Sequence, residues 1–171
     1  MKIAIIGTGN VGGALATKWA QAGHEICLGV RDVEAFKGQA LLNNPNTTVH
    51  PIQEAVAAAE VILLATPAPQ AVAVAKSLGN TEGKVIIDAM NVVMGRGPEG
   101  FDNTADAILA HTATTAVVKC FNTTGFNNMV NTNYGDLQAD NFVAGESAYA
   151  KEIAQQLSAD AGFAECYDVG G

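Results

Sequence analysis

The chain has 171 residues, enough for one domain with a substantial core, and 49% of them are hydrophobic. The net charge of −8 arises after residue 98, because residues 1–98 carry seven acidic and seven basic side chains and the remainder carry ten acidic and two basic ones. Neither part offers a basic patch, which argues against nucleic acid and against an anionic membrane surface as partners.

No apolar run approaches the roughly 18 residues that a membrane span requires, and the chain opens directly with a strand-like segment rather than a secretory signal. The three cysteines have neither metal-ligand nor CxxC spacing, and Cys27 and Cys120 stand in apolar runs typical of buried thiols. We therefore expect a cytoplasmic protein with a single domain, residues 1–171, that binds a small molecule.

The first 30 residues have the pattern of a strand, a helix and a second strand. Residues Ile3–Ile6 are apolar throughout, which is typical of a parallel strand buried on both faces. Apolar residues then recur at helical spacing from Val11 to Ala22, where Gly23 supplies a left-handed helix stop. A second apolar strand covers Glu25–Val30. This is a βαβ unit of about the length that a dinucleotide-binding motif requires.

The turn between the first strand and the helix carries a GxGxxG pattern. Gly7 permits the tight turn, Gly9 lets a pyrophosphate approach the main chain, and Gly12 allows close packing of the helix. The helix N-terminus then offers unpaired N–H groups to the phosphates. The strand–turn–helix context favours a dinucleotide site over a purely structural turn. The predicted cofactor-binding residues here are Gly7, Thr8, Gly9, Asn10, Val11 and Gly12.

The end of the second strand indicates which dinucleotide binds. An NAD enzyme usually has an acidic residue there, whereas this chain has Val30 and Arg31. The guanidinium of Arg31 fits a 2′-phosphate, so we expect NADP rather than NAD. Asp32 follows one residue later and is also a candidate helix cap. Lys37 either assists Arg31 or is an ordinary surface lysine.

The rest of the chain continues to alternate between strands and helices. We predict helices over residues 32–42, 53–59, 69–78, 103–111 and 147–161, and strands over residues 48–50, 60–65, 84–89, 116–121, 141–144 and 163–169. Residues 95–100 form a glycine-rich loop, and residues 127–139 show no assignable pattern. The expected fold is α/β and Rossmann-type, with a mostly parallel sheet of about eight strands and helices on both faces.

Polar residues follow several of the predicted strands. In a parallel sheet the carboxyl ends of the strands share one edge, where ligands bind. We therefore expect four further cofactor-binding residues beside the glycine turn: Thr66, Pro67, Asn91 and Asn122.

Three motifs together resemble a known family. Gly7–Gly12, Gly29–Arg31 and Val118–Asn122 are similar to the NADP oxidoreductases that use the deazaflavin coenzyme F420, and to the NADPH-binding domain of the STEAP metalloreductases. The similarity runs over essentially the whole chain. It implies a Rossmann fold, an NADP cofactor, and coenzyme F420 or a flavin as second substrate. It also implies that Thr8, Arg31, Thr66, Pro67 and Asn122 line the NADP site.

The chain departs from the family pattern in two places. Val30 stands where the family often has Ser, which removes one phosphate-binding hydroxyl. Family members usually continue for a few dozen residues beyond Gly171, in a helical tail that contributes to the second-substrate pocket and to a dimer contact. The sequence ends before such a tail: either it is truncated or this member closes its site differently, so the resemblance alone assigns neither the hydride acceptor nor a homodimer.

Other titratable residues show no pattern of a catalytic or metal site. His24, His50 and His111 are scattered without metal-ligand spacing, so no metal site is predicted. Lys119 lies within a strand and is expected to be structural rather than a base. Asp88, in an apolar strand, is expected to orient loops through hydrogen bonds.

The residues expected at the sheet edge indicate the type of reaction. They orient a ligand but are poor proton donors, and the chain has no Tyr-x-x-x-Lys pair for reducing a carbonyl. We therefore predict an NADP-dependent oxidoreductase that transfers hydride between NADP(H) and a flavin-like acceptor, namely coenzyme F420, FMN or FAD. Asn122 is the predicted catalytic residue, which holds the nicotinamide amide or the acceptor ring. The alternative is a non-catalytic module that binds or senses NADP(H).

Overall fold

The computed structural model describes all residues from Met1 to Gly171. Its centre is an eight-stranded sheet in the order β10-β9-β6-β5-β4-β1-β2-β3. These strands are β1 (Lys2–Ile6), β2 (Glu25–Val30), β3 (Thr47–Pro51), β4 (Val61–Leu64), β5 (Val85–Asp88), β6 (Val117–Cys120), β9 (Asn141–Ala144) and β10 (Cys166–Asp168). The β6–β9 pair is antiparallel and every other pair in this sheet is parallel. The Rossmann-type α/β fold is therefore confirmed.

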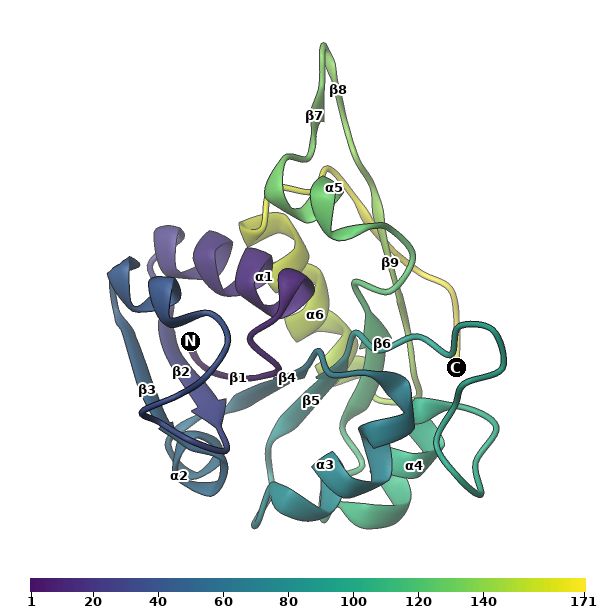
Figure 1. Ribbon diagram of the computed structural model, residues 1–171. Coiled ribbons are helices and arrows are strands. Elements are labelled where there is room, and N and C mark those ends of the chain that lie inside the picture. The colour runs from purple at the N-terminus through teal and green to yellow at the C-terminus, as the bar shows by residue number, and fades with distance from the viewer.

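Helices cover both faces of the sheet (Figure 1). They are α1 (Asn10–Gln21), α2 (Ile52–Ala58), α3 (Ala71–Ser77), α4 (Thr104–His111), α5 (Phe126–Val130) and α6 (Ala148–Asp160), with two 3₁₀ turns, η1 (Gln39–Asn43) and η2 (Ala68–Gln70). Helices α1 and α6 lie over one face, and α2, α3 and α4 over the other. A separate hairpin of β7 (Asn133–Tyr134) and β8 (Leu137–Gln138) projects from the body next to α5 (Figure 1).

Strand β1 shows why the sheet is apolar on both faces. Ile3 and Ile5 join a core cluster with Trp19 of α1, whereas Ala4 and Ile6 join a second cluster with residues of α2, α3 and α4. Successive side chains of a strand point to opposite faces, so a strand buried on both sides needs an unbroken apolar run. No helix of the chain combines the length and the apolar character that a membrane crossing would need.

The predicted helix over residues 32–42 is wrong. Residues 31–38 form bends and turns, and only η1 follows them. The Asp32 carboxylate accepts the main-chain N–H groups of Glu34 and Ala35, so it stabilises a local turn instead of capping a helix. Gly38 then has a left-handed φ of 95°, which a helix does not continue through.

Other element predictions needed smaller changes. The predicted helix over 69–78 is divided into η2 and α3, and the predicted last strand is shortened to β10. The segment without an assignable pattern contains most of α5 and the β7–β8 hairpin. Ser147 caps α6 by accepting the N–H of Ala150. Cys27 and Cys120 are both buried.

Candidate functional site

The strand order brings the predicted site residues to one edge of the sheet. Strand β1 lies between β2 and β4, so the direction in which the chain extends the sheet reverses there. Ligands of open α/β sheets bind at such a switch point, outside the carboxyl ends of the strands. The glycine turn follows β1, Arg31 follows β2, and Thr66 follows β4. Asn91 and Asn122 follow β5 and β6 at the same edge.

The three glycines of the turn are needed for different reasons. Gly7 has φ of 106°, and a Cβ there would lie 2.5 Å from the Ala65 carbonyl oxygen. A Cβ on Gly12 would collide with the carbonyl oxygen of Gly7. Gly9 has an ordinary φ of −78°, and a Cβ on it would meet nothing within 4 Å. The fold thus requires Gly7 and Gly12, whereas Gly9 leaves open space above the turn that a side chain would fill.

The open space at Gly9 lies at the N-terminus of α1. Gly9 is the N-cap residue, and no side chain caps the helix or places a negative charge in its first turn. The first N–H groups of an α-helix have no partner within the helix, and the helix dipole favours an anion there. The geometry of the turn therefore suits a phosphate group, and the residues present fit the pyrophosphate of a dinucleotide.

Beside this turn, an open pocket of about 380 Å³ lies at the ends of β2 and β3. Arg31 is exposed at this pocket and forms no ion pair with any carboxylate of the chain. Val30 is buried beneath it. The pocket residues are Val30, Arg31, Pro51, Ile52, Gln53, Glu54 and Ser77. The free guanidinium is suited to a phosphate, and we call the Gly7–Gly12 turn together with Arg31 the phosphate end of the site.

Thr8 connects the two parts of the phosphate end. Its hydroxyl donates to the carbonyl oxygen of Lys37, and a Cβ on Gly38 would lie 2.7 Å from the carbonyl oxygen of Thr8. The segment after Arg31 is therefore folded back against the glycine turn. Lys37 is exposed, and the structure gives its ammonium group no partner within the chain.

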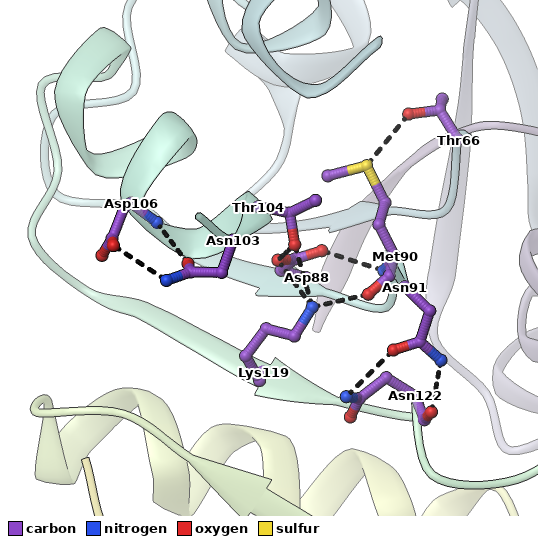
Figure 2. Close-up of polar contacts among 9 residues, drawn as sticks. All are labelled: Thr66, Asp88, Met90, Asn91, Asn103, Thr104, Asp106, Lys119 and Asn122. Carbon is purple, nitrogen blue, oxygen red and sulfur yellow. Dashed lines mark hydrogen bonds and ion pairs between the residues drawn. The ribbon is translucent and has the colours of Figure 1, made fainter. Parts of the chain in front are cut away.

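Two asparagine side chains meet at the ends of β5 and β6 (Figure 2). Asn91 Nδ2 donates to the main-chain carbonyl oxygen of Asn122 at 2.5 Å, and Asn122 Nδ2 lies 3.4 Å from Asn91 Oδ1. Thr66 is nearby through Met90, whose sulfur accepts the Thr66 hydroxyl at 3.2 Å. Pro67 is exposed beside Thr66. We call the Asn91–Asn122 pair the reaction end of the site.

Polar contacts support the reaction end, and only some of the residues that make them were predicted from the sequence. Asp88 and Lys119 form an ion pair at 3.0 Å, and Thr104 at the start of α4 donates its hydroxyl to the same carboxylate (Figure 2). Sequence reasoning expected a structural Lys119 and an orienting Asp88 but named neither partner. Thr104 and Met90 were missed as parts of this network, because nothing in the local sequence connects them to it.

The remaining titratable candidates lie outside the two ends. His24 bonds Asp160 and the N-terminus, His50 bonds Thr48, and His111 packs against the ring of Phe101. No group of three or more His, Cys, Asp or Glu residues is arranged to hold a metal ion.

Cys120 and Cys166 contact each other on the face of the sheet that α6 covers. Burial raises the pKa of the Cys120 thiol well above its ordinary value, while a hydrogen bond from Cys120 lowers the pKa of Cys166. The amide of Asn141 contacts the Cys120 sulfur at 3.3 Å. A thiol that is protonated and covered in this way is not a nucleophile for the sheet-edge site.

Comparison with known proteins agrees with this geometry. Residues 2–92 match the family model described as NADP oxidoreductase, coenzyme F420-dependent. The crystal structure of a provisionally assigned F420-dependent NADP reductase from Arthrobacter sp. FB24 is 30% identical, with a TM-score of 0.81. The alignment covers 99% of this chain and 84% of that one.

Two more distant structures share the fold alone. A hypothetical protein from Sinorhizobium meliloti is 22% identical with a TM-score of 0.79, and the alignment covers 99% of this chain and 85% of that one. A reductive aminase from Aspergillus terreus, solved with NADPH and ethyl levulinate, is 19% identical with a TM-score of 0.70, and this chain spans 54% of its length.

The family match covers more than half of the chain and contains the whole phosphate end, and the Arthrobacter structure extends the likeness over nearly all of the remainder. The chain therefore belongs to the family of coenzyme F420-dependent NADP oxidoreductases.

Proposed function

We propose that this protein binds NADP(H) along the carboxyl edge of its sheet and transfers hydride between it and a flavin-like acceptor, either coenzyme F420, FMN or FAD. The pyrophosphate lies over Gly9 at the N-terminus of α1, and the 2′-phosphate lies against Arg31. The family match and the fold shared with a reductive aminase solved with NADPH support the binding of NADP(H). The nicotinamide then extends toward Asn91 and Asn122.

The choice of acceptor rests on the hydrogen bonds that the Lys119 ammonium group makes within the protein. Its ammonium group donates to Asp88 Oδ2 at 3.0 Å, to the Met90 carbonyl oxygen at 2.5 Å and to Thr104 Oγ1 at 2.9 Å. An ammonium group has three protons, so all of its donors are engaged. Lys119 is therefore not free to protonate the oxygen of a carbonyl substrate.

The other groups at the reaction end also orient a ligand without supplying a proton. Asn91, Asn122 and Thr66 are neutral side chains with amide or hydroxyl groups. Reducing a ketone creates an alkoxide that an acid has to protonate, and none of these neutral groups is such an acid. A flavin or deazaflavin accepts hydride into a conjugated ring that spreads the charge itself. Bound NADPH supplies the hydride, and the protein needs only to hold the two rings about 3–3.5 Å apart.

Asn122 is the candidate catalytic residue in this arrangement. Its side chain projects from the end of β6 beside that of Asn91 (Figure 2). A carboxamide offers both a donor and an acceptor, which match the amide of nicotinamide or the carbonyl and N–H edge of a deazaflavin.

An acceptor panel tests the proposal. Purified protein is mixed with NADPH under anaerobic conditions, and coenzyme F420, FMN and FAD are compared with a set of ketones and imines. We expect NADPH oxidation with at least one ring acceptor and none with the carbonyl compounds. Ketone or imine reduction without transfer to any ring would contradict the proposal. NADPH binding without oxidation by any acceptor would indicate the alternative, a non-catalytic binding or sensing module.

A further inference from the structure

An ion pair joins β5 and β6 directly beneath the reaction end. Asp88 and Lys119 are register partners on these strands, and their charged atoms are 3.0 Å apart. Asp88 is completely buried, and the side chain of Lys119 is 23% exposed. A buried ion pair is weak evidence for added stability, because desolvation of both charges opposes their attraction. Its contacts with neighbouring groups therefore matter more than its presence.

The two charges hold both sides of one residue's main chain (Figure 2). Asp88 Oδ1 accepts the N–H of Met90 at 2.9 Å, and Lys119 Nζ donates to the Met90 carbonyl oxygen at 2.5 Å. The second carboxylate oxygen, Oδ2, accepts Lys119 and the hydroxyl of Thr104. Thr104 is held in place because Asn103 caps α4 by accepting the N–H of Asp106. The main chain of Met90, the residue that precedes Asn91, is thus held on both sides.

Asn91 passes this constraint to Asn122. Its amide donates to the main-chain carbonyl oxygen of Asn122 at 2.5 Å. On the other side, Phe121 turns the chain through a left-handed φ of 61°. A buried aromatic residue rarely adopts this conformation, and strained residues of this kind are concentrated at functional sites. Phe121 is held there by ring contacts with Trp19 and Phe163 at centroid distances of 5.6 and 6.1 Å.

We propose that Asp88 and Lys119 are positioning residues: by clamping the main chain of Met90 they fix Asn91, and through Asn91 they fix the carboxamide of Asn122. This inference rests on the proposed function in one respect, namely that the reaction end faces the nicotinamide and the acceptor. The clamp itself consists only of groups of the protein. Small displacements of an orienting group are costly in a hydride transfer, since a shift of about 1 Å can cost about 100-fold in rate.

The variants are chosen to separate positioning from folding. Lys119→Met alone leaves the Asp88 carboxylate buried without a counter-charge, which is strongly destabilising. The double variant Asp88→Asn with Lys119→Met keeps the net charge and leaves an acceptor for the Met90 N–H, but removes the donor to the Met90 carbonyl oxygen. Lys84→Met is the matched control, because Lys84 Nζ also donates to a main-chain carbonyl oxygen, that of Ala59 at 2.5 Å. Lys84 precedes β5 and so lies at the opposite end of that strand.

The first readout needs no cofactor. Side-chain amide signals of Asn91 and Asn122 are recorded by NMR in the wild-type protein and the variants. We expect resolved, slowly exchanging Asn91 amide protons in the wild-type protein and in Lys84→Met, and averaged, fast-exchanging ones in the double variant. Averaged signals in the wild-type protein, or unchanged signals in the double variant, would overturn the proposal.

The second readout is kinetic. For the double variant we expect kcat to fall by about 10- to 100-fold while the KM and Kd for NADPH stay within about twofold, because the phosphate end is untouched. A parallel loss of NADPH affinity, an unchanged kcat, or a double variant that does not fold would make the pair merely structural and overturn the proposal. If the wild-type protein transfers hydride to no acceptor, the proposed function fails, and the NMR readout still decides the positioning claim.

Discussion

The phosphate end and the reaction end are built by different means. At the phosphate end, main-chain groups and the absence of side chains define the site, with Arg31 as the one cation at its pocket. At the reaction end, side chains from β5, β6 and α4 hold one another through hydrogen bonds (Figure 2). The first design suits tight binding of a charged cofactor, and the second suits accurate placement of a ring. Affinity and turnover should therefore respond to different substitutions.

The largest expected effect comes from filling the open space at Gly9. Gly9→Val places a branched side chain at the proposed pyrophosphate position, while the φ of −78° at this residue suits any side chain. Loss of two charge-assisted hydrogen bonds of about 1.5–3 kcal/mol each should raise the Kd for both NADP and NAD by at least about 100-fold. Isothermal titration calorimetry measures both values.

Two neighbouring glycines serve as controls for that variant. Gly13→Ala should keep binding, because its Cβ would meet the Leu41 side chain at 3.6 Å and the Thr8 carbonyl oxygen at 4.0 Å, both ordinary contacts. Gly12→Ala should destabilise the fold by about 1–3 kcal/mol or more, since its Cβ would collide with the Gly7 carbonyl oxygen. Normal circular dichroism together with normal NADP binding in Gly9→Val would place the phosphates elsewhere.

The next effect separates NADP from NAD. Arg31→Ala removes the proposed charge-assisted contact with the 2′-phosphate, in total about 1.5–3 kcal/mol, so the Kd for NADP should rise by roughly 10- to 150-fold. NAD lacks that phosphate and should bind almost as before. Arg96→Ala is the matched control, because Arg96 is an exposed arginine in the loop after β5. Lys37→Ala in the same titration measures how far Lys37 assists. Equal losses for both dinucleotides would remove Arg31 from this role.

At the reaction end the opposite pattern is expected. Asn122→Ala should lower kcat by about tenfold or more and change the Kd for NADP by less than about threefold, because the orienting amide is lost while the phosphate end is intact. Steady-state kinetics with the best ring acceptor gives the first value and calorimetry the second. Asn127→Ala, an exposed asparagine in α5, is the control. A larger effect on Kd than on kcat would mean that the two ends are not separate in function.

The smallest effect concerns a surface pair that belongs to neither end. Lys151 bonds Asp168 at 2.8 Å and, with the N–H of Gly170, lowers the pKa of that carboxyl. A lowered folded-state pKa stabilises the fold above the unfolded pKa, and the contribution is lost as the pH falls through the folded-state pKa. Lys151→Met should return the pKa of Asp168 toward its ordinary value and leave kcat and Kd unchanged. A carbon-detected NMR titration of Asp168 checks this; an unchanged pKa would assign the shift to the Gly170 N–H alone.

The same contrast explains how much could be predicted from the sequence. The residues of the proposed phosphate end could be named from the sequence because their signals are local: the glycine turn and Arg31 stand within one βαβ unit. The predicted helix after Arg31 is wrong because of an equally local interaction: the Asp32 carboxylate stabilises a turn there. At the reaction end, Asn91 and Asn122 are 31 residues apart, and their pairing follows only from the strand order β6-β5. Thr104 joins that network from a helix on one face of the sheet, which periodicity does not reveal.

A crystal structure of the protein with NADP bound tests the central claim most directly. The account predicts the pyrophosphate over Gly9, the 2′-phosphate within hydrogen-bond distance of the Arg31 guanidinium, and the nicotinamide beside the Asn91–Asn122 pair with one ring face open to a tricyclic acceptor. A nicotinamide bound away from that pair, or with both faces covered by the protein, would contradict the division of the site into a phosphate end and a reaction end.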